Sequence, residues 1–240
     1  MHVYANPARF LKLARPLTAW LGWTGAALIL VALAFGLFYA PPERLQGESV
    51  RIIYLHVPAA WLGMAGWTGI ALASLMQLIW RHPLAAVAAR AVAVPGAVFT
   101  FLCLATGSLW GRPTWGTYWE WDGRMTSMLV LLFLYIGFIA LASAEKEKGG
   151  EGRITAIFGL VGAVNIPIIR FSVVWWNTLH QGESISFLRG SSTISSAMLW
   201  PLLASALGFS LLFGAIVLMR MRADLARTKI EARLKRMAAA

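Results

Sequence analysis

Charged residues are scarce in this chain of 240 residues, and cysteine is almost absent. Only 13% of the residues are charged, 59% are hydrophobic, and the mean hydropathy is +0.67. A soluble domain of this size carries nearly twice that share of charge, so the composition indicates a polytopic membrane protein. The single cysteine, Cys103, excludes a disulfide framework and any metal cluster built on cysteines. A bound cofactor would be held by histidine, methionine or packing.

Six apolar segments are long enough to cross a bilayer, for which a helix needs about 20 residues. They lie at Leu17–Ala40, His56–Trp80, Ala91–Trp110, Met125–Ser143, Ile154–Trp176 and Ser196–Met219. The predicted fold class is therefore all-α, a polytopic membrane protein of six transmembrane helices. We interpret residues 1–219 as one six-span domain and residues 220–240 as a basic tail. The first segment is too long for a signal peptide, so we expect a retained helix.

The distribution of lysine and arginine predicts the orientation in the membrane. Fifteen of the 21 basic residues fall on one side: Arg9, Lys12, Arg15, Arg81, Arg90, Lys146, Lys148, Arg153, Arg220, Arg222, Arg227, Lys229, Arg233, Lys235 and Arg236. By the positive-inside rule, both termini are cytoplasmic. Topology explains most of the net charge of +11, which therefore requires no nucleic-acid partner.

Two histidines and a tryptophan-rich connection are predicted to meet at the outer face. The connection, residues 110–124, contains Trp110, Trp115, Tyr118, Trp119, Trp121 and Asp122. His56 begins the second span at its outer end and His180 follows the fifth, whereas His2 and His82 lie on the cytoplasmic side. Indole faces pack well on a planar apolar ligand, and two neutral imidazoles can ligate haem iron axially. An aromatic belt is the alternative for isolated tryptophans at span ends.

The tryptophan-rich segment resembles a known family signature. Trp115-Gly-Thr-Tyr-Trp119-Glu-Trp121-Asp122, followed by Gly-Arg124, is similar to the "WWD" signature of haem-handling membrane proteins. The six-span layout, with the segments around His56 and His180, resembles the CcmC family of bacterial cytochrome c maturation over essentially the whole length. Tyr118 and Glu120 depart from the expected pattern, and tyrosine keeps the aromatic face.

The resemblance implies a role for each candidate residue. His56 and His180 would be the axial ligands of one non-covalent haem b on the periplasmic face. Trp115, Tyr118, Trp119 and Trp121 would form its platform, with Trp110 at the rim, and Asp122 would order the loop or contact a partner. Arg51 and Arg124 suit the haem propionates, because guanidinium pairs well with carboxylates. For Arg170 two interpretations stay open: snorkelling to the interface or a propionate contact.

The resemblance also implies partners and a place in the cell. The protein would present haem, in the bacterial inner membrane, to the haem chaperone CcmE. The ABC transporter subunits CcmA and CcmB, the small single-span subunit CcmD and membrane lipid would be its other partners. The sequence contains no recognisable nucleotide-binding loop and no acid–base or nucleophile constellation, so its status as an enzyme stays open. The alternatives are a permease subunit without its own haem site and a membrane cytochrome b, against which the absence of a mid-span histidine counts.

Overall fold

The computed structural model describes residues 6–150, 152–176, 178–180, 184–186 and 191–239. The elements are α1 (Pro7–Phe38), the short 3-10 helix η2 (Glu48–Ile52), α2 (Ile53–Trp80), α3 (Ala85–Trp115), α4 (Gly123–Glu147), α5 (Arg153–Gly162), α6 (Asn165–Trp175), β1 (Ile185–Ser186), β2 (Ser191–Ser192) and α7 (Ser196–Ala238). The two strands pair antiparallel over two residues each. His2, Asn177 and Ala240 lie outside the described residues.

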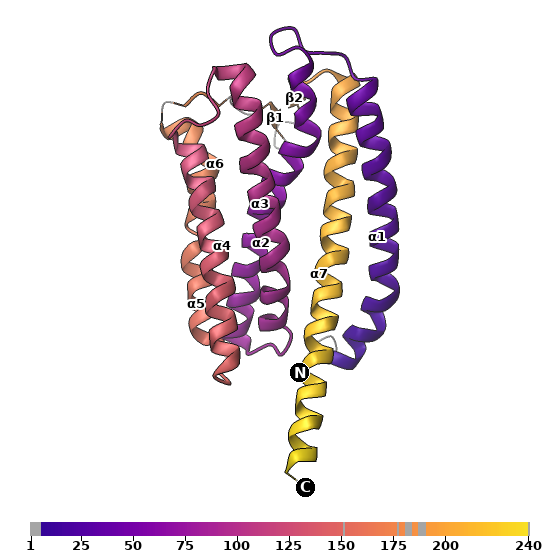
Figure 1. Cartoon of the computed structure of the whole chain (residues 1–240), viewed down its shortest axis with the longest axis vertical. Helices are drawn as coiled ribbons and strands as arrows, with labels where there is room; N and C mark the ends of the chain where they lie inside the picture. The colour runs from indigo at the N-terminus through magenta and orange to yellow at the C-terminus, as the bar shows by residue number, and fades with distance from the viewer. Residues whose placement is uncertain (1–5, 151, 177, 181–183, 187–190, 240) are drawn as a thin grey trace.

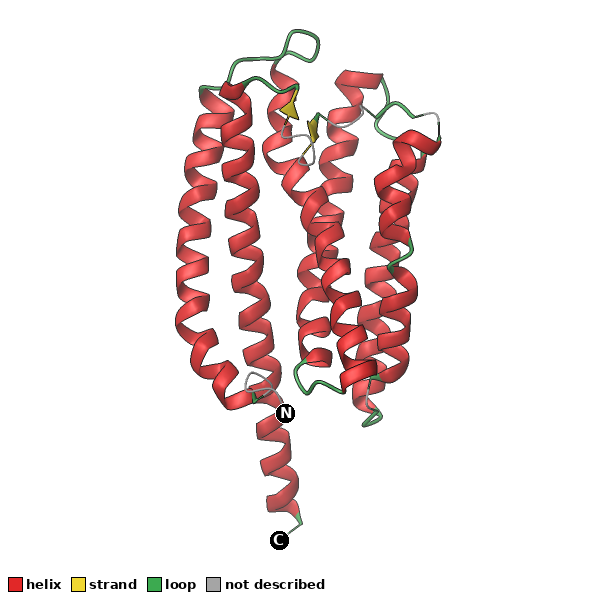
Figure 2. Ribbon diagram, turned by 180° about the vertical axis from the view of Figure 1, so that it is seen from behind, coloured by secondary structure: helices red, strands yellow, loops and turns green. Residues whose placement is uncertain are grey.

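The helices run alternately up and down and form one bundle (Figures 1 and 2). Among the described residues, six helical stretches are long and apolar enough to cross a membrane, with α5 and α6 together forming the fifth. The all-α, six-span prediction is therefore confirmed. α1 begins and α7 ends at the same end of the bundle, and the β1–β2 hairpin lies near the opposite end (Figure 1).

The fifth span is broken in the middle. α5 ends at Gly162, where an added Cβ would overlap the ring of Trp67, and α6 begins at Asn165. Pro167 has no backbone N–H, so it cannot donate the hydrogen bond that would continue α5 into α6. The buried Asn165 donates from Nδ2 to the backbone oxygen of Ser127 at 2.9 Å. This contact fastens the break against α4.

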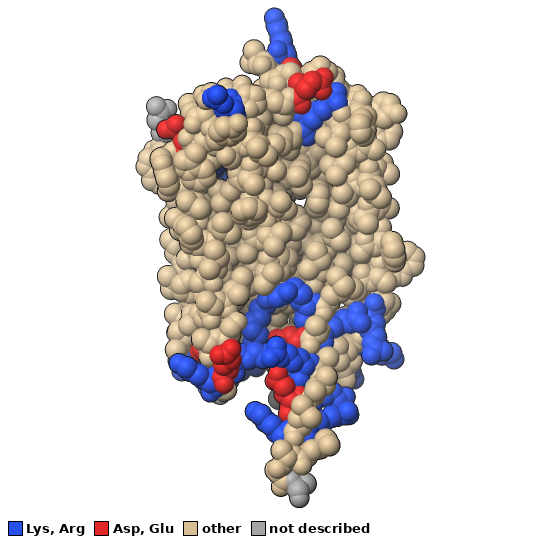
Figure 3. Space-filling view, viewed as in Figure 1, with Lys and Arg blue, Asp and Glu red and all other residues tan. Residues whose placement is uncertain are grey.

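The last helix is longer than the apolar segment that predicted it. α7 continues without interruption through the basic residues after Met219 and ends at Ala238. The helix extends beyond the apolar span predicted to end at Met219, because hydropathy marks the membrane boundary and the backbone hydrogen bonds of a helix need not stop there. Figure 3 shows most lysine and arginine side chains on that face gathered at this end, while the middle of the same face is mostly uncharged. The charge pattern is that of a protein crossing a membrane.

Small residues bring the central helices close together. Tyr135 of α4 is buried and donates its hydroxyl to the backbone oxygen of Gly63 on α2 at 2.7 Å. Its ring lies against Gly96 of α3, and Trp67 meets it edge-on with ring centroids 4.9 Å apart. Glycine at position 96 leaves room for the tyrosine between α2 and α3. Small residues of this kind permit close helix packing where lipid supplies no hydrophobic driving force.

Replacing Gly96 by alanine should destabilise this centre. The added methyl group would overlap the Tyr135 ring, and overpacking of a tight core costs about 1–3 kcal/mol. We expect a lower thermal unfolding temperature of the detergent-purified protein. Gly69→Ala on α2 is the control, because an added Cβ there meets nothing within 4 Å. Equal melting temperatures for the two variants would contradict this account.

Candidate functional site

Four helix ends meet at the end of the bundle opposite the C-terminus (Figure 1). They are the start of α2, the end of α3, the start of α4 and the end of α6. The tryptophan-rich connection is partly helical, because α3 continues past Trp110 to Trp115 and ends at Gly116 in the left-handed conformation (φ +82°). The predicted end of the third span at Trp110 is therefore too early. The Thr114 hydroxyl, bonded to the Trp110 carbonyl at 2.8 Å, lies in this added turn.

His56 lies in the first turn of α2 and faces α3. Its Nδ1 is 3.0 Å from the hydroxyl of Thr106, which itself donates to the Leu102 carbonyl at 2.6 Å. Because the Thr106 proton is used there, the hydroxyl oxygen accepts from Nδ1–H of His56. The lone pair of the imidazole is then on Nε2. A Cβ at Gly107 would come within 3.0 Å of the ring, so this glycine leaves the space that the imidazole occupies.

His180 is held by a buried carboxylate. Asp122, whose side chain is 3% exposed, accepts a hydrogen bond from His180 Nδ1 at 2.9 Å. The same carboxylate accepts from the Thr178 hydroxyl, and its other oxygen caps α4 by accepting from the Met125 N–H at 2.7 Å. One side chain thus joins the start of α4 to the segment after α6. These are the contacts of a residue that orders the loop.

The protonation states follow from these contacts. Burial raises the pKa of the Asp122 carboxyl, but hydrogen bonds from Thr178, Met125 and His180 lower it more, so that its pKa is below the ordinary value. Burial lowers the pKa of His180, and Asp122 only partly opposes this effect. His180 is therefore neutral at pH 7, donates through Nδ1 to an ionised carboxylate and carries its lone pair on Nε2. Both histidines have the tautomer that metal ligation through Nε2 requires.

Each histidine has a tryptophan beside it. Trp110 meets His56 edge-on with ring centroids 5.6 Å apart, and Trp115 meets His180 at 4.7 Å. The indole N–H of Trp110 donates to Gln46 Oε1 at 2.8 Å, so the loop between α1 and η2 orients this ring. The two tryptophans come from one turn and a half of α3. The end of α3 therefore packs against both imidazoles.

The remaining aromatic residues lie in the non-helical part of the connection. Trp119 is half-buried against the core, and its indole Nε1 is buried with no hydrogen-bond partner among the described residues. Trp121 lies 5.3 Å from it, centroid to centroid, and is 71% exposed. Tyr118 is 56% exposed and carries the Arg112 guanidinium over its ring at 5.6 Å. The segment thus has an exposed aromatic surface.

Three arginines were predicted to lie at the site, and their contacts differ. Arg124, in the first turn of α4, is close enough to act electrostatically on His180 and on Arg170 of α6. Within the described part of the chain, the buried Nε of Arg124 has no hydrogen-bond partner. Arg51 instead donates to the Leu37 and Ala40 carbonyls at the end of α1 and pairs with Glu48 at 2.8 Å. These contacts fasten η2 to α1.

Three polar residues of this site carried no signal in the sequence. Thr106, Thr178 and Gln46 support His56, Asp122 and Trp110 respectively. A threonine inside an apolar span usually bonds the carbonyl four residues earlier, as Thr106 also does, so its second contact could not be inferred from spacing. Each pair lies at least 50 residues apart in the sequence. Only the packing of the helices reveals them.

The fold and the site define a six-span membrane protein with two histidines and an aromatic segment at one end. The family described as heme exporter protein C (CcmC) matches residues 1–236. Heme exporter protein C of Bradyrhizobium diazoefficiens is 50% identical over 229 residues, 94% of this chain and 85% of that protein. The Escherichia coli K12 protein of the same name is 46% identical over 222 residues, 92% and 89% of the two chains. The Paracoccus denitrificans protein is 40% identical over 234 residues, 97% and 96%.

These matches extend over nearly all of this chain and most of each relative. The chain belongs to the heme exporter protein C family. The resemblance to the CcmC family that the tryptophan-rich segment indicated is thereby confirmed.

Replacing Asp122 by alanine should loosen the junction of α4 with the His180 segment. The change removes the α4 N-cap, for which about 1 kcal/mol is typical, and the acceptor of His180 Nδ1. We expect faster amide hydrogen exchange at Met125 and at His180. Glu120→Ala removes an exposed carboxylate two residues earlier and should leave both amides unchanged. Unaltered protection in Asp122→Ala would refute the structural role.

Proposed function

We propose that this protein binds haem at the periplasmic membrane face and presents it to a haem chaperone for cytochrome c maturation. The observation that carries the proposal is that His56 and His180 lie at the same end of the bundle and that each has its Nδ1 within hydrogen-bond distance of a side chain distant in sequence, Thr106 or Asp122, an arrangement that suits metal binding through Nε2. The relatives at 38–50% identity bear the name heme exporter protein C, which supports haem as the ligand. Haem would supply an iron that accepts two axial nitrogens.

The chain's own residues fit a haem group. Carboxylate or hydroxyl partners on the distal ring nitrogen are what hold a metal-ligating histidine in place, and Asp122 and Thr106 have that position. The buried Nε of Arg124 suits a propionate, with Arg170 close to it. A carboxylate placed between two guanidinium groups would relieve their mutual repulsion. We therefore assign Arg170 to a propionate, in place of simple snorkelling.

The aromatic residues have two functions in this proposal. Trp110 and Trp115 pack against the imidazoles and orient them, whereas Trp119, Trp121 and Tyr118 form the surface on which the macrocycle lies. The exposure of Trp121 and Tyr118 leaves an apolar face available to a second protein. Asp122 orders the aromatic segment through its bond to His180, and Arg51 supports the segment indirectly by holding η2 in place.

The setting follows from the family and the charge pattern. We propose the bacterial inner membrane, with both termini cytoplasmic and the site facing the periplasm. Before transfer, the ligand would be non-covalent haem b, and CcmE would receive it. CcmA, CcmB and CcmD would form the surrounding ABC-type complex. The permease alternative without a haem site differs in one measurable property, the presence of bound haem.

Loss of either proposed ligand should abolish low-spin haem binding. In the detergent-purified protein we expect the absorption spectrum of a bis-histidine haem, and His56→Ala and His180→Ala should each lose it. Changes to residues that support a metal ligand typically weaken metal affinity about 10–100-fold. Loss of a ligand itself should weaken haem binding more than that. His82→Ala is the control, because His82 lies at the other end of the bundle. Equal haem content in all three variants would refute the ligand assignment. A parent protein without haem would favour the permease alternative.

Thr106 should act on haem through His56. Thr106→Val keeps the shape and removes the acceptor, so the proton of His56 is no longer confined to Nδ1. We expect roughly tenfold weaker haem binding and a shift from low-spin to high-spin absorption. Thr106→Ser retains the hydroxyl and should restore both properties. If valine and serine gave the same low-spin spectrum, Thr106 would have only a packing role.

A further inference from the structure

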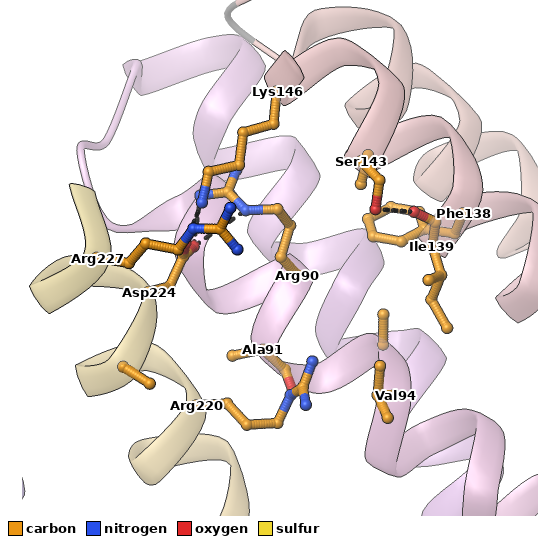
Figure 4. A pocket seen from close by; sticks show the side chains of 13 residues that line it. Arg90, Ala91, Val94, Phe138, Ile139, Ser143, Lys146, Arg220, Asp224 and Arg227 are labelled. Atoms are coloured by element: carbon orange, nitrogen blue, oxygen red, sulfur yellow. Dashed lines mark hydrogen bonds and ion pairs between the residues drawn. The ribbon is translucent and has the colours of Figure 1, made fainter. Parts of the chain in front are cut away.

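A polar cavity lies between α3, α4 and α7, at the end of the bundle opposite the two histidines. Its volume is about 360 Å³ (Figure 4). Its charged lining residues are Arg90, Lys146, Arg220, Asp224 and Arg227, and the rest of its wall is mainly alanine with Val94, Phe138 and Ile139. The wall therefore has a cationic part and an apolar part.

The charges of the lining do not balance. Among the described residues that line the cavity, Asp224 is the only carboxylate, and it accepts from Arg90 at 2.7 and 3.1 Å and from Lys146. Figure 4 shows both cationic side chains directed at this carboxylate. One negative charge thus faces two positive ones before Arg220 and Arg227 are counted. The described residues of the lining therefore carry a net positive charge, which favours an anionic ligand.

Neighbouring carboxylates are engaged elsewhere. Glu145 caps α5 by accepting from the backbone N–H groups of Ile154 and Thr155 at 3.2 and 2.8 Å. Glu231 pairs with Arg227 at 2.8 Å but does not line the cavity. Arg220 donates from Nε to the backbone oxygen of Ala91 at 3.1 Å, a neutral acceptor that leaves the guanidinium charge uncompensated. Its remaining donors can therefore serve an anionic ligand.

The apolar part of the wall gives the ligand a second property. Phe138 is fully buried, and Val94 and Ile139 extend the apolar wall from α3 and α4 toward the middle of the bundle. A free phosphate would meet only the cationic part. A phospholipid places its phosphate at the level of the basic residues and its acyl chain deeper, which matches both parts. Basic pockets between transmembrane helices on the cytoplasmic side are suited to anionic headgroups.

We propose that this cavity binds one acidic phospholipid. Arg220 and Arg227, with Arg90 and Lys146, hold the phosphate, and the first part of an acyl chain lies along Val94 and Ile139. The bound lipid joins α7 to α3 and α4. Asp224 of α7 makes the same connection through Arg90 of α3 and Lys146 of α4. The proposal is independent of the haem site at the other end of the molecule.

Native mass spectrometry of the full-length, delipidated protein tests this site. With phosphatidylglycerol or phosphatidylcholine added, we expect one tightly retained phosphatidylglycerol and no comparable phosphatidylcholine. Arg220→Gln should weaken that retention about fivefold, the equivalent of the roughly 1 kcal/mol that one basic residue contributes near an anionic surface. Arg227→Gln changes an exposed side chain of the same lining and should weaken it too, even if Arg220→Gln does not fold.

The control is Arg233→Gln, an equal charge change on an exposed residue of α7 beyond the cavity. It should retain the lipid as the parent does. Equal retention in Arg220→Gln, Arg227→Gln and Arg233→Gln would overturn the proposal, since non-specific attraction to the basic tail would then explain the binding. Complete displacement of the lipid by millimolar inorganic phosphate would also overturn it and assign the cavity to a soluble phosphate.

Discussion

Within a bilayer, a backbone or side-chain polar group must find its partner inside the protein, because no water is present to replace it. This constraint separates the chemistry of the chain into two ends. Two polar side chains in the middle find backbone partners on other helices: Asn165 bonds the Ser127 carbonyl at the break between α5 and α6, and Tyr135 bonds the Gly63 carbonyl. Groups able to bind a ligand lie at the helix ends. The histidines and Arg124 lie at one end, and the basic cavity lies at the other.

At the histidine end, the two candidate ligands are supported in different ways. His56 is part of a helix, and a neighbouring helix supplies Thr106 as its partner. His180 follows the end of α6, where no helix constrains it, and a buried carboxylate with a lowered pKa replaces that constraint. Because Asp122 also caps α4, a movement of the His180 segment would disturb the start of α4 and the aromatic residues just before it. Asp122 thus links His180, a candidate ligand, to the start of α4, next to the aromatic residues.

The parts of this arrangement that could be read from the sequence are those that depend on composition along the chain. Apolar runs predicted six spans, and topology alone placed His56, His180 and the tryptophan-rich connection at one end. Hydropathy could not find the ends of α3 and α7, because each helix continues beyond its apolar run. Nor could it find Thr106 or the cavity around Asp224, since both depend on side chains that meet only when helices distant in sequence pack together. The sequence also could not distinguish Arg51, which bonds the carbonyl of Ala40 and pairs with Glu48, from Arg124, whose buried Nε has no partner among the described residues.

α3 connects the two ends of the molecule. Arg90, near its start, pairs with Asp224 in the basic cavity, and Thr106, Trp110 and Trp115, near its other end, contact the two histidines. Pro95 lies between these two groups of residues and removes one backbone hydrogen bond from the helix, so no unbroken ladder of hydrogen bonds joins the two ends of α3. The acidic lipid proposed for the basic end would contact only the first part of α3, as far as Val94. The residues that contact the histidines begin at Thr106, beyond Pro95, so the same helix serves two sites with separate sets of side chains.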